Sequence, residues 1–224
     1  MREKISQSAE DYLKVIYEIT RLGDLATTNE IADRLGVTAA STTGMIQKLA
    51  TTNPPLVEYQ KHHGVSLTSV GEQMALKIIR HHRLLELFLQ EKLGYTWDEV
   101  HAEADRLEHV ISENLEERIA QVLGNPVYDP HGEPIPSREF QVPSLSNVRL
   151  SDLHSGDQAV VQYLGDTTPE LLRYLGSIGL TPNSKLTVLD HSPYDGNLYL
   201  QISGQETAYV LGPRITQEIY VEIT

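Results

Sequence analysis

In the first 70 residues, three short amphipathic segments are separated by helix-breaking residues, and this pattern limits the possible folds more than any other feature. Apolar residues recur at helical spacing in residues 9–22, 28–35 and 38–50, which predicts three helices. Ser8, Thr28 and Thr38 stand where N-caps are expected, and Gly36 stands where the second helix should end. Two short extended runs, 56–60 and 65–68, then predict a β-hairpin.

This order of helix, helix–turn–helix and hairpin is typical of a winged-helix DNA-binding domain. Hydroxyl and amide side chains near the start of the third helix can bond to phosphates and base edges, and lysine can meet phosphate. The helix has no arginine, so we expect DNA shape to supply part of the specificity. The alternative is an ordinary helix pair with a Ser/Thr-rich N-terminus. The residues expected to be exposed toward DNA are Thr38, Ala39, Ser41, Thr42, Gln47 and Lys48.

The distribution of charge keeps DNA binding open although the formal net charge is -13. Residues 1–70 carry seven Lys/Arg and eight Asp/Glu, a balance of -1, whereas residues 71–140 carry seven and fourteen, a balance of -7. The first segment can therefore approach DNA, and the second concentrates acidic ligands. The chain has no apolar run near 18 residues and no secretory pattern in residues 1–10, so we expect no membrane partner and a cytoplasmic location.

The rest of the chain reads as helices followed by strands. Residues 69–92 predict one long helix, residues 97–123 a helical stretch in two pieces, and the proline-containing residues 125–143 an ordered linker. Short β-rich runs at 159–163, 186–189, 198–202 and 218–223, with one helix near 169–178, are typical of a small β-barrel. The predicted fold class is mainly α with a β-rich C-terminal part.

Histidine and carboxylate side chains gather at helical spacing in the middle segment. Steps of 4, 3 and 1 place four of them on one side of a helix, an i, i+4 pair lies on the preceding helix, and one aspartate of the first helix can add an oxygen. These residues are His101, Asp105, Glu108 and His109, then His82 and Glu86, and finally Asp11.

Such a set of ligands can bind Mn²⁺, Fe²⁺ or Zn²⁺, and the absence of cysteine excludes thiolate sites and favours harder cations. The alternative is that the carboxylates form exposed ion pairs and that His82 is a buried, hydrogen-bonded histidine. A metalloenzyme would need an open coordination position and a placed base, and the His-Glu-x-x-His motif is absent. The residues therefore favour a non-catalytic cation site; a metal buffer that does not bind DNA is a further alternative.

Six stretches together resemble the diphtheria toxin repressor family of metal-dependent regulators, and more closely its three-domain, manganese-responsive branch. They are AEDYLKVIY at 9–17, EIADRL at 30–35, LTSVG at 67–71, HRLLE at 82–86, VHAEADRLEH at 100–109 and PHGEPIP at 130–136. The resemblance covers nearly the whole chain. It implies a winged helix over residues 1–72, a helical metal-binding and dimerisation domain with its linker over 73–143, and an SH3-like domain over 144–224. It also implies a homodimer that represses transcription from a palindromic double-stranded operator, with no small-molecule substrate.

The resemblance also implies two metal sites. The first matches Asp11, His82, Asp105, Glu108 and His109. The second matches Glu86 and His101 in one branch of the family, and Glu86, Asp129, His131 and Asp166 in the three-domain manganese branch. Iron-sensing relatives place methionine and cysteine where this chain has Asp11 and Asp105, and replacing soft sulfur by carboxylate favours Mn²⁺ over Fe²⁺, with Zn²⁺ or Co²⁺ able to bind in vitro.

The position of Asp11 suggests how metal could control DNA binding. A cation that joins Asp11 to the dimerisation helices would hold two recognition helices at the separation of successive major grooves. Without it, we expect Asp11, Asp105 and Glu108 to repel one another. The C-terminal domain is then either a stabilising module or, through Asp166, a further support for the second metal.

Overall fold

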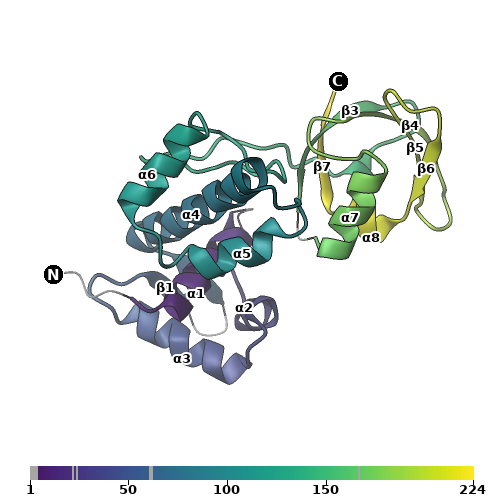
Figure 1. The fold of residues 1–224 in the computed structure, drawn as a ribbon. Helices are drawn as coiled ribbons and strands as arrows, with labels where there is room; N and C mark the ends of the chain where they lie inside the picture. Colours follow the sequence, from purple (N-terminus) through teal and green to yellow (C-terminus); the bar gives the residue numbers. More distant parts are fainter. Residues whose placement is uncertain (1–4, 22, 24, 61–62, 166) are drawn as a thin grey trace. The chain divides into compact units, whose positions relative to one another are not determined.

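The computed structural model describes the chain except residues 1–4, 22, 24, 61–62 and 166. The chain divides into two compact units. The first consists of Met1–His82, Arg106–Ser112 and Pro136–Gln141, and the second of Arg83–Asp105, Glu113–Ile135 and Val142–Thr224. The predicted fold class is confirmed, because helices with a small hairpin form the N-terminal part and an antiparallel sheet forms the C-terminal part (Figure 1).

The first three helices are α1 (Gln7–Thr20), α2 (Thr28–Leu35) and α3 (Ala39–Ala50). Thr38 caps α3 as predicted, and Gly36 ends α2 with a left-handed backbone at φ 64°, a conformation that glycine adopts without steric cost. The other two predicted caps are wrong. Ser6 rather than Ser8 accepts from the backbone of α1, and Thr27 rather than Thr28 caps α2 in a capping box with Glu30.

A two-stranded hairpin follows α3 and completes the core of this part. β1 (Val57–Gln60) pairs antiparallel with β2 (Gly64–Leu67), with Val57 opposite Leu67. Residues 61–62, which lie between the two strands in the sequence, are outside the described residues. The core of this part includes five buried aliphatic side chains, Leu13, Ile16, Ile31, Ile46 and Leu49.

Three further helices follow: α4 (Ser69–Leu93), α5 (Val100–Leu107) and α6 (Glu113–Val122). The predicted helical start at Trp97 is wrong, because residues 97–99 form a turn in which the Glu99 carboxylate accepts from the backbone and hydroxyl of Thr96. The Trp97 side chain packs instead against the core of the C-terminal sheet. No helix within the described residues combines the length and apolarity needed to cross a membrane.

The C-terminal part is a five-stranded antiparallel sheet with the order β6-β5-β4-β3-β7. Its strands are β3 (Gln158–Leu164), β4 (Lys185–His191), β5 (Leu198–Ile202), β6 (Ala208–Leu211) and β7 (Ile219–Ile223). Helix α7 (Pro169–Ser177) shares the sheet's apolar core through Leu172 and Leu175. The short elements η1 (Leu150–Asp152), β6 and α8 (Pro213–Thr216) were not anticipated from the sequence.

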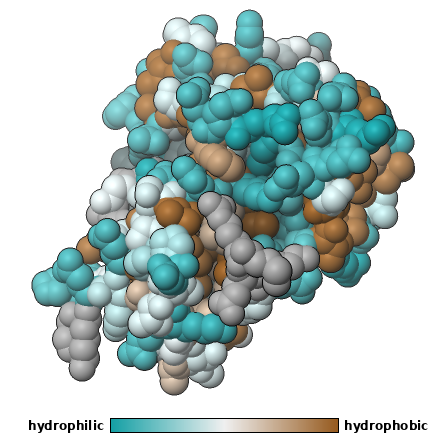
Figure 2. Space-filling model, turned by 90° about the vertical axis from the view of Figure 1, so that its left-hand side faces the viewer, coloured by the Kyte–Doolittle hydropathy of each residue, from teal (hydrophilic) through white to brown (hydrophobic). Residues whose placement is uncertain are grey.

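The surface is predominantly hydrophilic on the face shown in Figure 2, with apolar side chains gathered in smaller patches. In the second unit, some exposed apolar residues lie on α4 and α6 and in the segment after α6. These residues are Leu93, Leu115, Val122, Val127 and Tyr128.

Candidate functional site

Helix α1 brings two carboxylates onto the imidazole of His109. Nδ1 of His109 lies 2.7 Å from Oε2 of Glu10, and Nε2 lies 2.8 Å from Oδ1 of Asp11. The His109 side chain is buried, whereas Asp11 is partly exposed. Burial raises the pKa of Asp11 above its usual value; the nearby Glu108 also raises it, and His109 opposes the shift.

Glu108 lies beside this imidazole with its carboxylate almost fully buried. Lys14 donates to both of its oxygens, at 2.9 and 3.2 Å, and His82 Nδ1 contacts one of them. Burial favours the neutral acid, but the contacts with His82 and Lys14 outweigh it and lower the pKa of Glu108. A buried carboxylate kept ionised in this way is a suitable cation ligand.

Ligand atoms of Asp11, Glu108 and His109 lie within 4.8 Å of one another. The first unit therefore brings together three of the five residues expected in the first metal site, with His82 in contact with one of them. Oxygen and imidazole donors without sulfur fit a divalent cation such as Mn²⁺. Asp105 belongs to the second unit, and its part in this site stays a prediction.

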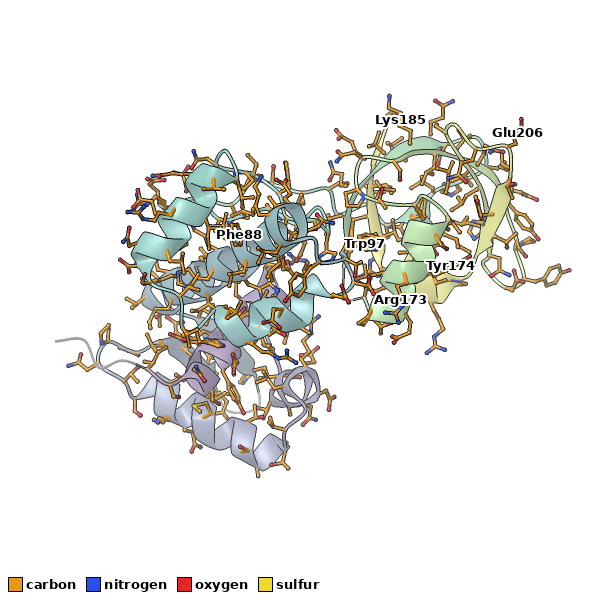
Figure 3. All side chains as sticks on the ribbon, viewed as in Figure 1. Phe88, Trp97, Arg173, Tyr174, Lys185 and Glu206 are labelled. Atoms are coloured by element: carbon orange, nitrogen blue, oxygen red, sulfur yellow. The ribbon has the colours of Figure 1, made fainter. Side chains whose placement is uncertain are left out.

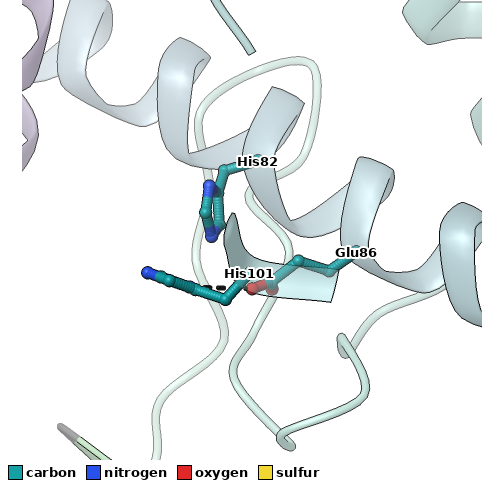
Figure 4. A group of neighbouring side chains, drawn as sticks. All are labelled: His82, Glu86 and His101. Atoms are coloured by element: carbon teal, nitrogen blue, oxygen red, sulfur yellow. Dashed lines mark hydrogen bonds and ion pairs between the residues drawn. The ribbon is translucent and has the colours of Figure 1, made fainter. Parts of the chain in front are cut away.

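A chain of contacts links the acidic and histidine residues of the second unit. Glu86 is buried on α4, and its Oε1 lies 3.0 Å from Nδ1 of His101 on α5. Figure 4 shows this pair together with His82, which lies one helical turn earlier on α4. The exposed His101 ring also lies 3.5 Å from a carboxylate oxygen of Asp105, its i+4 neighbour. Both i, i+4 pairs of the middle segment are thus on adjacent turns of helices, as the spacing predicts.

Glu86 also faces the loop after α6. Ligand atoms of Glu86, Asp129 and His131 lie within 4.8 Å of one another, with Oε2 of Glu86 3.8 Å from Nδ1 of His131. Burial and the charge of Glu86 raise the pKa of Asp129 to about 7. Burial lowers the pKa of His131, but the adjacent Glu86 and Asp129 carboxylates outweigh it and raise this pKa to about 9. Asp166, the fourth expected ligand, lies outside the described residues.

Two basic side chains support these clusters and were missed from the sequence. Lys14 lies three residues after Asp11, so helical spacing could have placed it on the same face. Arg83, almost fully buried, donates to the carbonyl of Pro134 at 2.6 Å and to Glu133 at 2.8 Å, which holds the turn that carries Asp129. Nothing local in the sequence distinguishes Arg83 from an exposed helical arginine.

Helix α3 and its N-cap expose most of the residues expected to face DNA. They are Thr38, Ala39, Ser41, Gln47 and Lys48. Thr42 differs from the prediction, because it is fully buried and its hydroxyl lies 3.3 Å from the hydroxyl of Tyr12. Thr42 lies four residues before Ile46 and seven before Leu49, so the apolar period of α3 could have indicated its burial.

Three family models match consecutive parts of the chain. Residues 4–65 match the iron dependent repressor N-terminal DNA binding domain, residues 68–137 the iron dependent repressor metal binding and dimerisation domain, and residues 148–223 the FeoA domain. The iron-dependent repressor IdeR of Mycobacterium leprae is 34% identical over 211 residues, which span 89% of this chain and 90% of that protein.

Solved structures give the same result in three dimensions. The chain is similar to a manganese-dependent transcriptional repressor in complex with manganese, with 40% identity, a TM-score of 0.88 and coverage of 96% of this chain and 100% of that one. The manganese regulator SloR is 30% identical, with a TM-score of 0.79 and coverage of 96% and 98%.

Proposed function

The chain belongs to the iron-dependent repressor family, whose members are metal-dependent DNA-binding transcriptional repressors and not enzymes, and from this premise we propose that Mn²⁺ activates it. The support is the donor set: Asp11, Glu108 and His109 offer oxygen and imidazole within 4.8 Å, without sulfur. Carboxylate oxygen suits Mn²⁺ better than soft ligands do. Fe²⁺ is the second candidate, because relatives such as IdeR are named as iron-dependent.

We assign two sites to the ion. The first consists of Asp11, His82, Asp105, Glu108 and His109, and the second of Glu86, Asp129, His131 and Asp166, with His101 as a further ligand. The contacts within each unit support the first three members of the second site and all of the first except Asp105. The ion would supply positive charge where carboxylates of separate elements meet.

We assign DNA reading to the exposed side of α3 and dimer formation to the helices of the middle segment. Thr38, Ala39, Ser41, Gln47 and Lys48 would meet the operator, and the buried Thr42 is left out. The exposed apolar residues along α6 and after it support association of two chains. We place the three domains at residues 1–72, 73–143 and 144–224, a winged helix, a helical domain with its linker and an SH3-like domain.

The contact of Asp11 with His109 carries the proposal, because it joins the DNA-binding helices to the metal ligands of the middle segment. The expected repulsion between Asp11 and Glu108 is moderated, because His109 and Lys14 lie among the carboxylates. A bound ion would strengthen this junction and bias the chain toward the state that fits DNA.

The test is operator binding by an Asp11→Ala variant across a Mn²⁺ titration, measured by gel shift. We expect the variant to need at least tenfold more Mn²⁺ than the wild type for half-maximal binding. Asp33→Ala, which removes an exposed acid of α2, is the matched control and should behave as the wild type. Unchanged metal dependence in Asp11→Ala would refute the assignment of the first site. The same titration with Fe²⁺ under anaerobic conditions ranks the two ions.

A further inference from the structure

The C-terminal sheet part contacts the second metal cluster through the backbone of its ligand loop. The carbonyl of His131 accepts from the amide of Leu164, the last residue of β3, at 3.0 Å. Gly132 has a φ of +86°, and a Cβ at this position would lie 2.0 Å from the carbonyl oxygen of Gln162. The loop therefore lies directly on the backbone of β3, and only glycine permits this approach.

The imidazole of His131 is held by a second route. Its Nε2 lies 2.9 Å from the backbone carbonyl oxygen of Trp97. The centroids of the His131 imidazole and the Trp97 indole lie 6.0 Å apart. A carbonyl oxygen can only accept, so Nε2 carries a hydrogen, and Nδ1, which faces Glu86, is the nitrogen at which a cation would replace a proton. The orientation of His131 thus depends on the position of Trp97.

Trp97 is itself held by α7. A Cβ at Gly176 would lie 3.1–3.3 Å from three indole atoms, so the helix backbone packs tightly against the ring. Beside it, Arg173 donates to Asp98 at 2.7 Å. Figure 3 shows Trp97 beside α7 near Arg173, whereas Lys185 and Glu206 lie at the other end of the sheet part. Trp97 also packs against the core of the sheet part.

We propose that α7 is a positioning element for the second metal site: by holding Trp97, it orients the ring of His131 toward the ion. This inference rests on the second site of the proposed function, and it does not require the sheet part to supply a ligand. It predicts that a change in α7, remote in sequence from every ligand, weakens Mn²⁺ binding at the second site alone. Groups that orient metal ligands typically change metal affinity by roughly 10–100-fold.

The test uses Gly176→Leu, which pushes on the indole while replacing a glycine within a helix by a better helix former. Ser177→Leu, which introduces the same side chain at the exposed neighbouring position, is the matched control. Each is made in two full-length backgrounds: Glu108→Gln, which leaves the second site intact, and Glu86→Gln, which leaves the first. Mn²⁺ affinity is measured by equilibrium dialysis, and emission of Trp97, the single tryptophan, reports the junction.

We expect Gly176→Leu to weaken Mn²⁺ binding about tenfold in the Glu108→Gln background and to leave it unchanged in the Glu86→Gln background. Ser177→Leu should change neither. Equal affinity in the Glu108→Gln background, or an equal loss in both backgrounds, would overturn the proposal. If circular dichroism shows that Gly176→Leu unfolds the sheet part, Arg173→Ala replaces it in the Glu108→Gln background. We then expect the affinity for Mn²⁺ to fall about threefold, and an unchanged affinity would contradict the proposal.

The outcomes separate this inference from the function on which it rests. If Glu108→Gln binds no Mn²⁺, the second site itself fails and the positioning role falls with it. If Glu108→Gln binds Mn²⁺ and Gly176→Leu does not weaken it, only the positioning role fails.

Discussion

Replacing Lys14 by methionine tests whether this ammonium serves as an internal counterion of the first metal site. Its Nζ lies 2.9 and 3.2 Å from the two oxygens of Glu108 and 3.1 Å from Nδ1 of His82. The side chains of Lys14 and Glu108 are only 13% and 2% exposed. Removing one partner of a buried pair costs roughly 3–5 kcal/mol. Because Glu108 keeps His82 as a partner, we expect Lys14→Met to lower the free energy of unfolding by about 2 kcal/mol without divalent metal.

Added Mn²⁺ should reverse much of this loss. Two unit charges about 4 Å apart interact by roughly 4 kcal/mol at an effective dielectric constant of 20, so a neighbouring ammonium opposes a bound cation. Glu108 lies between the two positive charges and offsets part of this repulsion, and we therefore expect Lys14→Met to bind Mn²⁺ only about tenfold more tightly, or about 1.4 kcal/mol. The variant is thus less stable without the ion and more strongly stabilised by it.

The assay is urea unfolding followed by far-ultraviolet circular dichroism, with and without Mn²⁺. Lys14→Arg, which keeps the charge, is the control and should stay close to the wild type in both conditions. A Lys14→Met variant as stable as the wild type without metal would refute the counterion role. The counterion role would also be refuted if Mn²⁺ stabilised Lys14→Met no more than it stabilises the wild type.

Three further predictions address separate parts of the molecule. Thr42→Val should lower the free energy of unfolding by about 1 kcal/mol yet leave gel-shift affinity unchanged, whereas Ser41→Ala should weaken operator binding; the reverse pattern would contradict the burial of Thr42. The capping contacts to Thr27 lower the pKa of Glu30 in the folded state. The stabilisation by Glu30 is therefore present above its unfolded pKa of 4.5 and is lost as the pH falls through its lower folded pKa. Glu30→Gln should remove this acid sensitivity, measured in thermal melts from about pH 3 to 6. Arg83→Met should lower the free energy of unfolding by about 3 kcal/mol in urea titrations, because it removes a buried charged donor to the Pro134 carbonyl and the ion pair with Glu133; a loss below 1 kcal/mol would contradict this role.

Local chemistry was readable in advance because it involves residues a few positions apart. The helical spacing of His82 with Glu86 and of His101 with Asp105 gave pairs on adjacent turns, and Thr38 and Gly36 marked ends of helices. Two caps were misplaced by one or two residues. Several hydroxyl residues stand near the starts of α1 and α2, and the one that caps depends on where the first turn begins.

Contacts between residues far apart in the sequence could be found only from the tertiary structure. The burial of Thr42 depends on Tyr12, 30 residues away, and the ammonium of Lys14 reaches Glu108 across 94 residues. The loop with His131 is held by β3 and Trp97, which no periodicity connects to it.

The order of residues by itself therefore determined the longer helices, the hairpin, the class of ligands and the family resemblance, because spacing along a helix or strand decides which neighbours share a face. Only the packed molecule decided which side chain lies beside each ligand. Such contacts arise from shape and burial among distant segments, and these are properties of the assembled core rather than of any short stretch of chain.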